Sequence, residues 1–89
     1  MIEVTPQDLL GERIVLLRRR RHWTQPELAA KVGMGVTTLN RLENGHQSIS
    51  MKNLIPLVRA LGTTADYLLG LSEKPEKDAE TEPATLAVA

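Results

Sequence analysis

Four hydrogen-bonding side chains recur at helical spacing in residues 36–44. We expect a helix there with Leu39 and Leu42 facing a core. At about 100° per residue, its opposite face carries Thr37, Asn40, Arg41 and Asn44. All four side chains donate hydrogen bonds, and all except Arg41 also accept them. Such a face can pair with nucleic-acid bases, Arg41 with guanine and Asn40 with adenine. A solvated helix face would have the same composition, so this stripe alone leaves both interpretations open.

Residues 24–45 indicate two short helices joined by a tight turn. Thr24 followed by Glu27 forms a capping box that begins the first of them. Gly33 has the position of a left-handed glycine that ends this helix, and Gly45 stops the second. Two helices in this order let a core hold the second one while it lies in the major groove of DNA.

Three further helices complete the expected fold: residues 5–21, residues 51–61, and a short helix between Thr64 and Gly70. Thr5 and Asp8 supply the N-terminal signals of the first. Apolar residues with helical spacing form the expected core stripes, at Leu10, Ile14 and Leu17 and at Leu54, Leu57, Val58 and Leu61. No strand signal has comparable strength. We therefore predict an all-α fold, with one domain over residues 5–71.

The net charge of zero conceals a strong asymmetry. Residues 13–59 contain nine Lys or Arg and two Asp or Glu, whereas residues 73–89 contain two Lys and five Asp or Glu. A basic body with an acidic tail fits a polyanionic partner. Residues 72–89 lack an apolar period, so we expect a flexible acidic tail there.

Several functional classes find no support in the composition. The chain has no cysteine, so it offers neither a disulfide nor a thiolate metal site. No apolar run approaches the roughly 18 residues of a membrane-spanning helix, and the N-terminus lacks the pattern of a signal peptide. His22 and His46 have no partners at metal-ligand spacing. No catalytic set or phosphate-binding glycine loop is evident, so we expect neither an enzyme nor a cofactor.

Residues 8–71 resemble the helix-turn-helix family of the phage lambda and 434 repressors and Cro, the XRE-like group. The resemblance lies in Arg18, Thr24-Gln25, Leu28-Ala29, Gly33, Leu39, Leu42, Glu43-Asn44-Gly45, Ala60-Leu61-Gly62 and Tyr67-Leu68-Leu69. It implies a compact five-helix domain that binds double-stranded DNA as a homodimer and represses or otherwise regulates transcription. It also implies a cytoplasmic bacterial or phage protein that joins the nucleoid when bound to DNA.

The resemblance also implies roles for individual residues. Gln25, next to Thr24, falls on a position that contacts backbone phosphate and in some members a base, and Asn44 on a phosphate-contacting position. Five residues fall on positions that face the major groove: Val36, Thr37, Thr38, Asn40 and Arg41. This chain departs from the pattern at Gly35, where Ser or Thr usually caps the helix. It departs again at Val36, where a long polar side chain often reads bases, so only an apolar contact is expected there.

Arg18 and Glu43 occupy positions that form an internal ion pair in the family. The helical angles agree, because Arg18 follows the Ile14 and Leu17 stripe and Glu43 flanks the core. The alternative is an exposed Arg18 on phosphate. The run of arginines at residues 18–21 cannot form one face, because consecutive helical residues point in different directions.

Two aromatic residues have positions with more than one interpretation. Trp23 precedes the Thr24 cap and is expected to act as a hydrophobic staple or core residue. Tyr67, with Leu68 and Leu71, is expected to form the dimer contact. The reason is that the one helix that would read DNA, the recognition helix over residues 36–44, gives only a small interface with DNA. Ordinary packing at the end of the bundle is the alternative.

The C-terminal residues 85–89, Thr-Leu-Ala-Val-Ala, are apolar after an acidic stretch. They fit an inert end, a short strand that pairs with a partner chain, or a degradation signal. Two other functions remain open for the whole chain. One is an antitoxin whose acidic tail or last helix binds a toxin protein while the DNA-binding domain regulates the operon. The other is a protein-interaction module that does not bind DNA.

Overall fold

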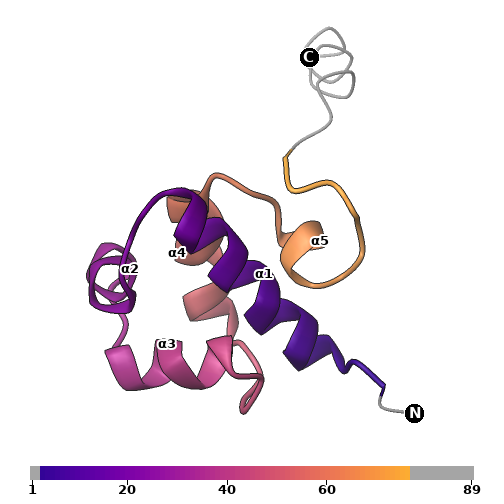
Figure 1. Ribbon diagram of the computed structural model, residues 1–89, viewed down its shortest axis with the longest axis horizontal. Coiled ribbons are helices and arrows are strands. Elements are labelled where there is room, and N and C mark those ends of the chain that lie inside the picture. The colour runs from indigo at the N-terminus through magenta and orange to yellow at the C-terminus, as the bar shows by residue number, and fades with distance from the viewer. Residues whose placement is uncertain (1–2, 77–89) are drawn as a thin grey trace, which may run out of the picture.

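The computed structural model describes residues 3–76, which form a bundle of five α-helices (Figure 1). The helices are α1 Pro6–Arg20, α2 Gln25–Val32, α3 Val36–Glu43, α4 Met51–Leu61 and α5 Ala65–Leu68. No strand occurs within residues 3–76. The predicted all-α five-helix fold is therefore confirmed, and the expected helix boundaries agree with the observed ones to within a residue or two.

Local capping interactions explain where α1 and α2 begin and where α2 ends. Thr5 and Asp8 exchange hydrogen bonds of 3.0 and 3.2 Å at the start of α1. Thr24 and Glu27 form the same reciprocal box at the start of α2, at 2.8 and 3.2 Å. Gly33 then ends α2 with φ 72°, a left-handed conformation that side chains with a Cβ rarely adopt.

Leucines from every helix meet in one core. The fully buried side chains are Ile14, Leu28, Leu39, Leu42, Leu57, Leu61 and Leu68. Figure 1 shows α3 below α2 and beside the middle of α1, and α3 contacts both of these helices. Val58, expected in the α4 stripe, is only half-buried and packs against the edge of this core. Helices α1 and α2 hold α3 from one side and leave its other side open.

A glycine lets α1 approach the end of α3 closely. A Cβ at Gly11 would lie 2.5 Å from the carbonyl oxygen of Leu42, and closer still to that of Glu43. Both obstacles are backbone atoms, which cannot rotate out of the way as a flexible side chain can. Gly11 is thus one reason why α3 can pack so close to α1.

The structure corrects the expected dimer contact at α5. Tyr67 and Leu68 are buried at 6% and 0% exposure, and both belong to the core cluster. The guanidinium of Arg13 covers the Tyr67 ring, with its central carbon 4.1 Å from the ring centroid. Tyr67 and Leu68 hold α5 onto the bundle, so the surfaces of these two side chains are not available to a second copy. Leu71 remains exposed, at 75%.

The chain continues to contact the bundle after α5. Arg13 donates to the carbonyl oxygens of Tyr67 and Ser72, and pairs with the Glu73 carboxylate at 3.0 Å. Thr63 donates to the carbonyl of Pro75. Residues 72–75 therefore lie against the domain. Residues 77–89 of the expected acidic tail, with the C-terminal Thr-Leu-Ala-Val-Ala, lie outside the described residues.

None of the five helices has both the length and the apolar character needed to cross a membrane.

Candidate DNA-binding site

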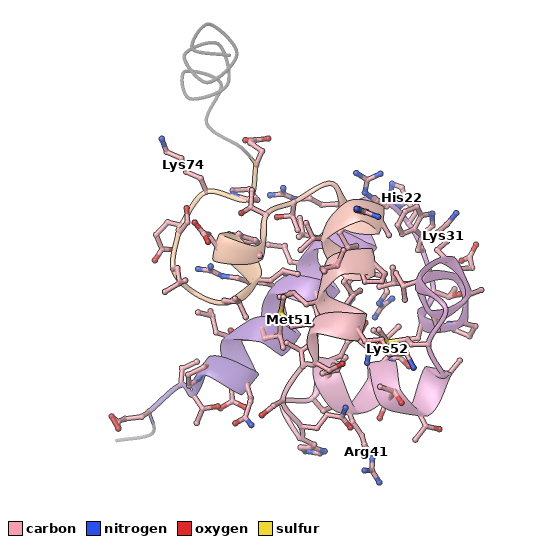
Figure 2. The ribbon with its side chains drawn as sticks, turned by 180° about the vertical axis from the view of Figure 1, so that it is seen from behind. His22, Lys31, Arg41, Met51, Lys52 and Lys74 are labelled. Atoms are coloured by element: carbon pink, nitrogen blue, oxygen red, sulfur yellow. The ribbon has the colours of Figure 1, made fainter. Side chains whose placement is uncertain are left out.

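The side chains of α3 divide between the core and the solvent. Leu39 and Leu42 have no exposed surface, while the four polar residues of the opposite face, Thr37, Asn40, Arg41 and Asn44, are exposed. In Figure 2 the side chain of Arg41 points away from the body of the molecule. The helix thus presents a row of hydrogen-bonding groups on a rigid support, which is what contact with base edges requires.

The start of α3 carries the apolar part of this face. Val36 is 42% exposed and Thr38 is half-buried. Gly35 is the N-cap and gives α3 no side-chain cap, unlike the threonines that begin α1 and α2. Because Gly35 has no side chain to accept from the first backbone N–H groups of α3, these groups can donate to an anion such as a phosphate.

An ion pair joins the end of α3 to α1. Arg18 Nε lies 2.7 Å from Glu43 Oε2, and Arg18 Nη2 lies 3.0 Å from Glu43 Oε1. The side chains are 12% and 4% exposed, so the pair is largely removed from water. Arg18 also donates to the carbonyl of Trp23 at 2.9 Å. The expected pair is therefore present, and Arg18 is not an exposed residue awaiting phosphate.

Gln25 extends this pair toward the exposed face of α3. Its Nε2 donates to Glu43 Oε1 at 2.7 Å, and its Oε1 faces Asn40 Nδ2 at 3.5 Å. Gln25 is half-buried at the first position of α2, directly after the exposed Thr24. Because one of its two N–H bonds is engaged, the amide keeps a second donor for the phosphate contact expected of it.

The amide of Asn44 turns back onto α3. Its Nδ2 lies 2.8 Å from the backbone oxygen of Asn40 and 3.3 Å from Asn40 Oδ1. Both contacts engage Asn44 Nδ2, the atom that would also have to donate in the expected phosphate contact. Sequence reasoning placed Asn40 and Asn44 on one face but missed their mutual contact. Their i, i+4 spacing was the available signal.

The turn between α1 and α2 holds Trp23 between cations. Arg21 and Lys31 place their charged groups 5.3 and 4.7 Å from the centroid of the Trp23 ring. Arg21 also donates to the carbonyl of Leu61 at 3.2 Å. Trp23 is half-buried against the core, in agreement with a structural role. Two arginines of the run, Arg18 and Arg21, therefore serve local contacts.

Arg13 is the buried charge that sequence reasoning missed. It follows the same α1 stripe as Leu10 and Ile14 but faces α5 and residues 72–73. A signal was present in its position three residues after Leu10, on the side of α1 that faces the bundle. Within residues 3–76, no three His, Cys, Asp or Glu side chains are grouped so that they could hold a metal ion.

Comparisons with known proteins agree with this geometry. A family model described as helix-turn-helix matches residues 14–68. The HTH-type transcriptional regulator ImmR of Bacillus subtilis is 30% identical over 69 residues, which are 78% of this chain and 54% of ImmR. The chain therefore spans about half the length of that relative. Antitoxin HipB of Escherichia coli is 27% identical over 67 residues, which are 75% of this chain and 71% of HipB.

A solved structure has the same arrangement of helices. The restriction-modification controller protein C.AhdI from Aeromonas hydrophila superimposes with a TM-score of 0.65 at 26% identity, over 70% of this chain and 94% of C.AhdI. The matched family region begins within α1 and includes all of α2, α3, α4 and α5. This chain belongs to the helix-turn-helix family of the XRE type.

Proposed function

We propose that this chain binds double-stranded DNA in a sequence-specific manner through α3 and thereby regulates transcription. The observation that carries the proposal is the division of α3, in which two leucines are fully buried and the polar side chains opposite them are exposed. Such a helix fits the major groove, where each base pair presents a distinct pattern of donors and acceptors. ImmR is named as a transcriptional regulator, which supports the same role here.

The contacts follow from the chemistry of each side chain. Arg41 points away from the body of the molecule and fits O6 and N7 of guanine. Val36 and the methyl groups of Thr37 and Thr38 fit a thymine methyl. Thr24 and Gln25, at the start of α2, fit the phosphate backbone. The basic composition of residues 13–59 supplies the long-range attraction to DNA.

The functional unit is a homodimer on an inverted repeat. One eight-residue recognition helix covers a small area, and two copies supply the affinity that a single copy lacks. The half-site centres lie about 34 Å apart, one turn of DNA. With Tyr67 and Leu68 buried, the dimer contact falls to exposed apolar side chains of α4 and the α5 end: Met51, Ile55, Leu69 and Leu71. Figure 2 shows Met51 on the side of α4 nearer to α5.

Occupation of a promoter by such a dimer blocks polymerase, so we assign repression in preference to activation. The assignment places the protein in the bacterial cytoplasm, associated with the nucleoid when it is bound. It requires no cofactor and no catalytic step.

Selection of binding sites from random duplexes tests the proposal. Purified protein should enrich one inverted repeat, and affinity should fall with salt at a log–log slope near −0.9 per neutralised phosphate. Arg41→Ala and Thr37→Ala should change the preferred base at fixed positions. Arg59→Ala removes the same charge as Arg41→Ala from the exposed side of α4 and should keep the preference. Absence of salt-dependent binding to any duplex would instead favour a protein-interaction module.

Sedimentation tests the dimer separately. Leu71→Asp should shift the protein toward monomers and weaken binding to the inverted repeat more than to a single half-site. Ala30→Asp places the same charge on an exposed position of α2 and should leave the association unchanged. A Leu71→Asp protein that dimerises like the wild type would remove this surface from the proposal.

The similarity to HipB supports a second candidate, an antitoxin that also regulates its own operon. A gene for a small basic protein next to this one would favour it. Expression of that neighbouring gene should arrest growth, and co-expression of this chain should restore it. Growth arrest that this chain does not relieve would reject the antitoxin role and leave DNA regulation untouched.

A further inference from the structure

The ion pair between α1 and α3 fixes the orientation of an amide at the edge of the candidate site. A carboxylate only accepts hydrogen bonds, so Gln25 must turn its Nε2 toward Glu43, where the distance is 2.7 Å. The same rotation turns Gln25 Oε1 outward. Arg18 donates to both oxygens of Glu43 and holds the carboxylate in place, and neither oxygen could donate to a reversed glutamine.

The orientation of the Asn40 amide is set by contacts with two neighbouring amides, those of Gln25 and Asn44. Its Nδ2 faces Gln25 Oε1 at 3.5 Å, the longest contact in the series. Its Oδ1 faces Asn44 Nδ2 at 3.3 Å, and Asn44 is itself held by the Asn40 backbone oxygen at 2.8 Å. A reversed Asn40 amide would set oxygen against oxygen at Gln25 and N–H against N–H at Asn44. Both neighbours therefore favour a single orientation.

The exposed part of Asn40 retains one donor and one acceptor. A primary amide has two N–H donors and a carbonyl oxygen with two lone pairs, and the two neighbours use one of each. Asn40 is exposed to solvent on the same face as Arg41. In the major groove, adenine alone presents a donor, N6–H, next to an acceptor, N7. Guanine presents two acceptors there, so its O6 would meet the carbonyl oxygen of Asn40.

We propose that Asn40 reads one adenine in each half-site, with Gln25 and Asn44 as the positioning residues that set the direction of its amide. This inference rests on the proposed DNA binding and names one base that the site reads. Because donor and acceptor have a fixed order relative to α3, the adenine lies on one particular strand. An A·T pair is accepted at this position and the reversed T·A pair is rejected. In this assignment Asn44 acts through Asn40, and its N–H groups do not contact phosphate.

Site selection with four proteins tests the inference: wild type, Asn40→Ala, Gln25→Met and Asn44→Ala. Wild type should prefer adenine on one strand at one position of each half-site. Asn40→Ala should lose that preference, about 5- to 150-fold for a bidentate contact, and keep the other positions. Gln25→Met and Asn44→Ala should each weaken the preference for adenine over thymine at this same position.

A double-substitution cycle separates positioning from independent contacts. Gln25→Met added to Asn40→Ala should cause no further change in preference at the adenine position, because its effect passes through Asn40. Gln7→Met serves as the matched control, since it removes another glutamine amide hydrogen bond, 2.8 Å long to Ser48, from the start of α1. Thermal melts of every variant identify any loss of preference that reflects unfolding.

The outcomes distinguish this inference from the function on which it rests. No binding to any duplex overturns the proposed function itself. Specific binding in which Asn40→Ala keeps every base preference overturns the assignment of Asn40, as does loss of preference for a base other than adenine. Specific binding in which both Gln25→Met and Asn44→Ala retain the full preference for A·T over T·A overturns the positioning role.

Discussion

Glu43, near the end of α3, is held by two nitrogens of Arg18 on α1, at 2.7 and 3.0 Å, in a position almost closed to water. The attachment of α3 to α1 therefore includes a buried ion pair whose positive charge comes from Arg18 alone. Gln25 donates to the same carboxylate, so the contact also connects α2 to the arrangement.

Arg18→Ala should therefore destabilise the domain strongly. It leaves the Glu43 carboxylate, only 4% exposed, without its cation, and loss of one partner of a buried pair costs about 3–5 kcal/mol. That is a large part of the about 5–15 kcal/mol that typically stabilises a protein. Thermal and urea unfolding measure the loss. Arg19→Ala, at an exposed neighbouring residue, should stay within about 0.5 kcal/mol of wild type. A melting temperature for Arg18→Ala close to that of wild type would contradict the role of the pair.

Gly11→Ala should separate α1 from α3. The added methyl would lie 2.5 Å from the carbonyl oxygen of Leu42 and nearer to that of Glu43, so a backbone must move. Overpacking of this kind costs about 1–3 kcal/mol. Gly35→Ser is the informative comparison, because nothing lies within 4 Å of a Cβ there and the new hydroxyl can cap α3. It should raise stability by a few tenths of a kcal/mol, and denaturant midpoints should therefore shift in opposite directions.

Acid should weaken the start of α2. The backbone N–H of Thr24 donates to the Glu27 carboxylate at 2.8 Å and lowers the pKa of Glu27, with smaller effects from the Thr24 side chain and the charge of Lys31. A carboxyl with a lowered folded pKa contributes stability that is present above its unfolded pKa, about 4.3, and is lost as pH falls through the folded value. The free-energy difference between wild type and Glu27→Gln should thus be constant near neutral pH and shrink in acid. A difference that grows on acidification would contradict this linkage.

Arg13→Met should loosen α5 and residues 72–75 together. The substitution leaves the carbonyl oxygen of Ser72 without its Arg13 donor and removes the cation from the Tyr67 ring, while the Tyr67 carbonyl keeps the backbone N–H of Gly70 at 3.2 Å. A buried group left unsatisfied costs about 1–3 kcal/mol. Glu73→Gln should cost less than about 1 kcal/mol, because its carboxylate is 94% exposed. Amide hydrogen exchange should show faster opening near Leu68 in Arg13→Met only. Equal protection in the two variants would contradict this role of Arg13.

Local chemistry allowed much of the fold to be predicted from the sequence. Thr24 and Glu27 are three residues apart, so the signal for their capping box lies entirely in the local sequence. Gly33 and Gly62 supply left-handed ends for the same reason. The Leu39 and Leu42 stripe required only helical periodicity, and it placed the polar face of α3 on the outside.

The tertiary structure decided what depends on which elements meet. Tyr67 could face a second copy or the core, and the packing of α5 on α1 placed it inside, under Arg13. Nothing in the sequence around Gly11 showed that this position needs a glycine, because the requirement comes from the close approach of α3. The direction of the Asn40 amide depends on Gln25, and Gln25 is oriented by the ion pair that joins α1 to α3. Periodicity within one helix determines which face points inward, but only the approach of distant segments determines what that face touches.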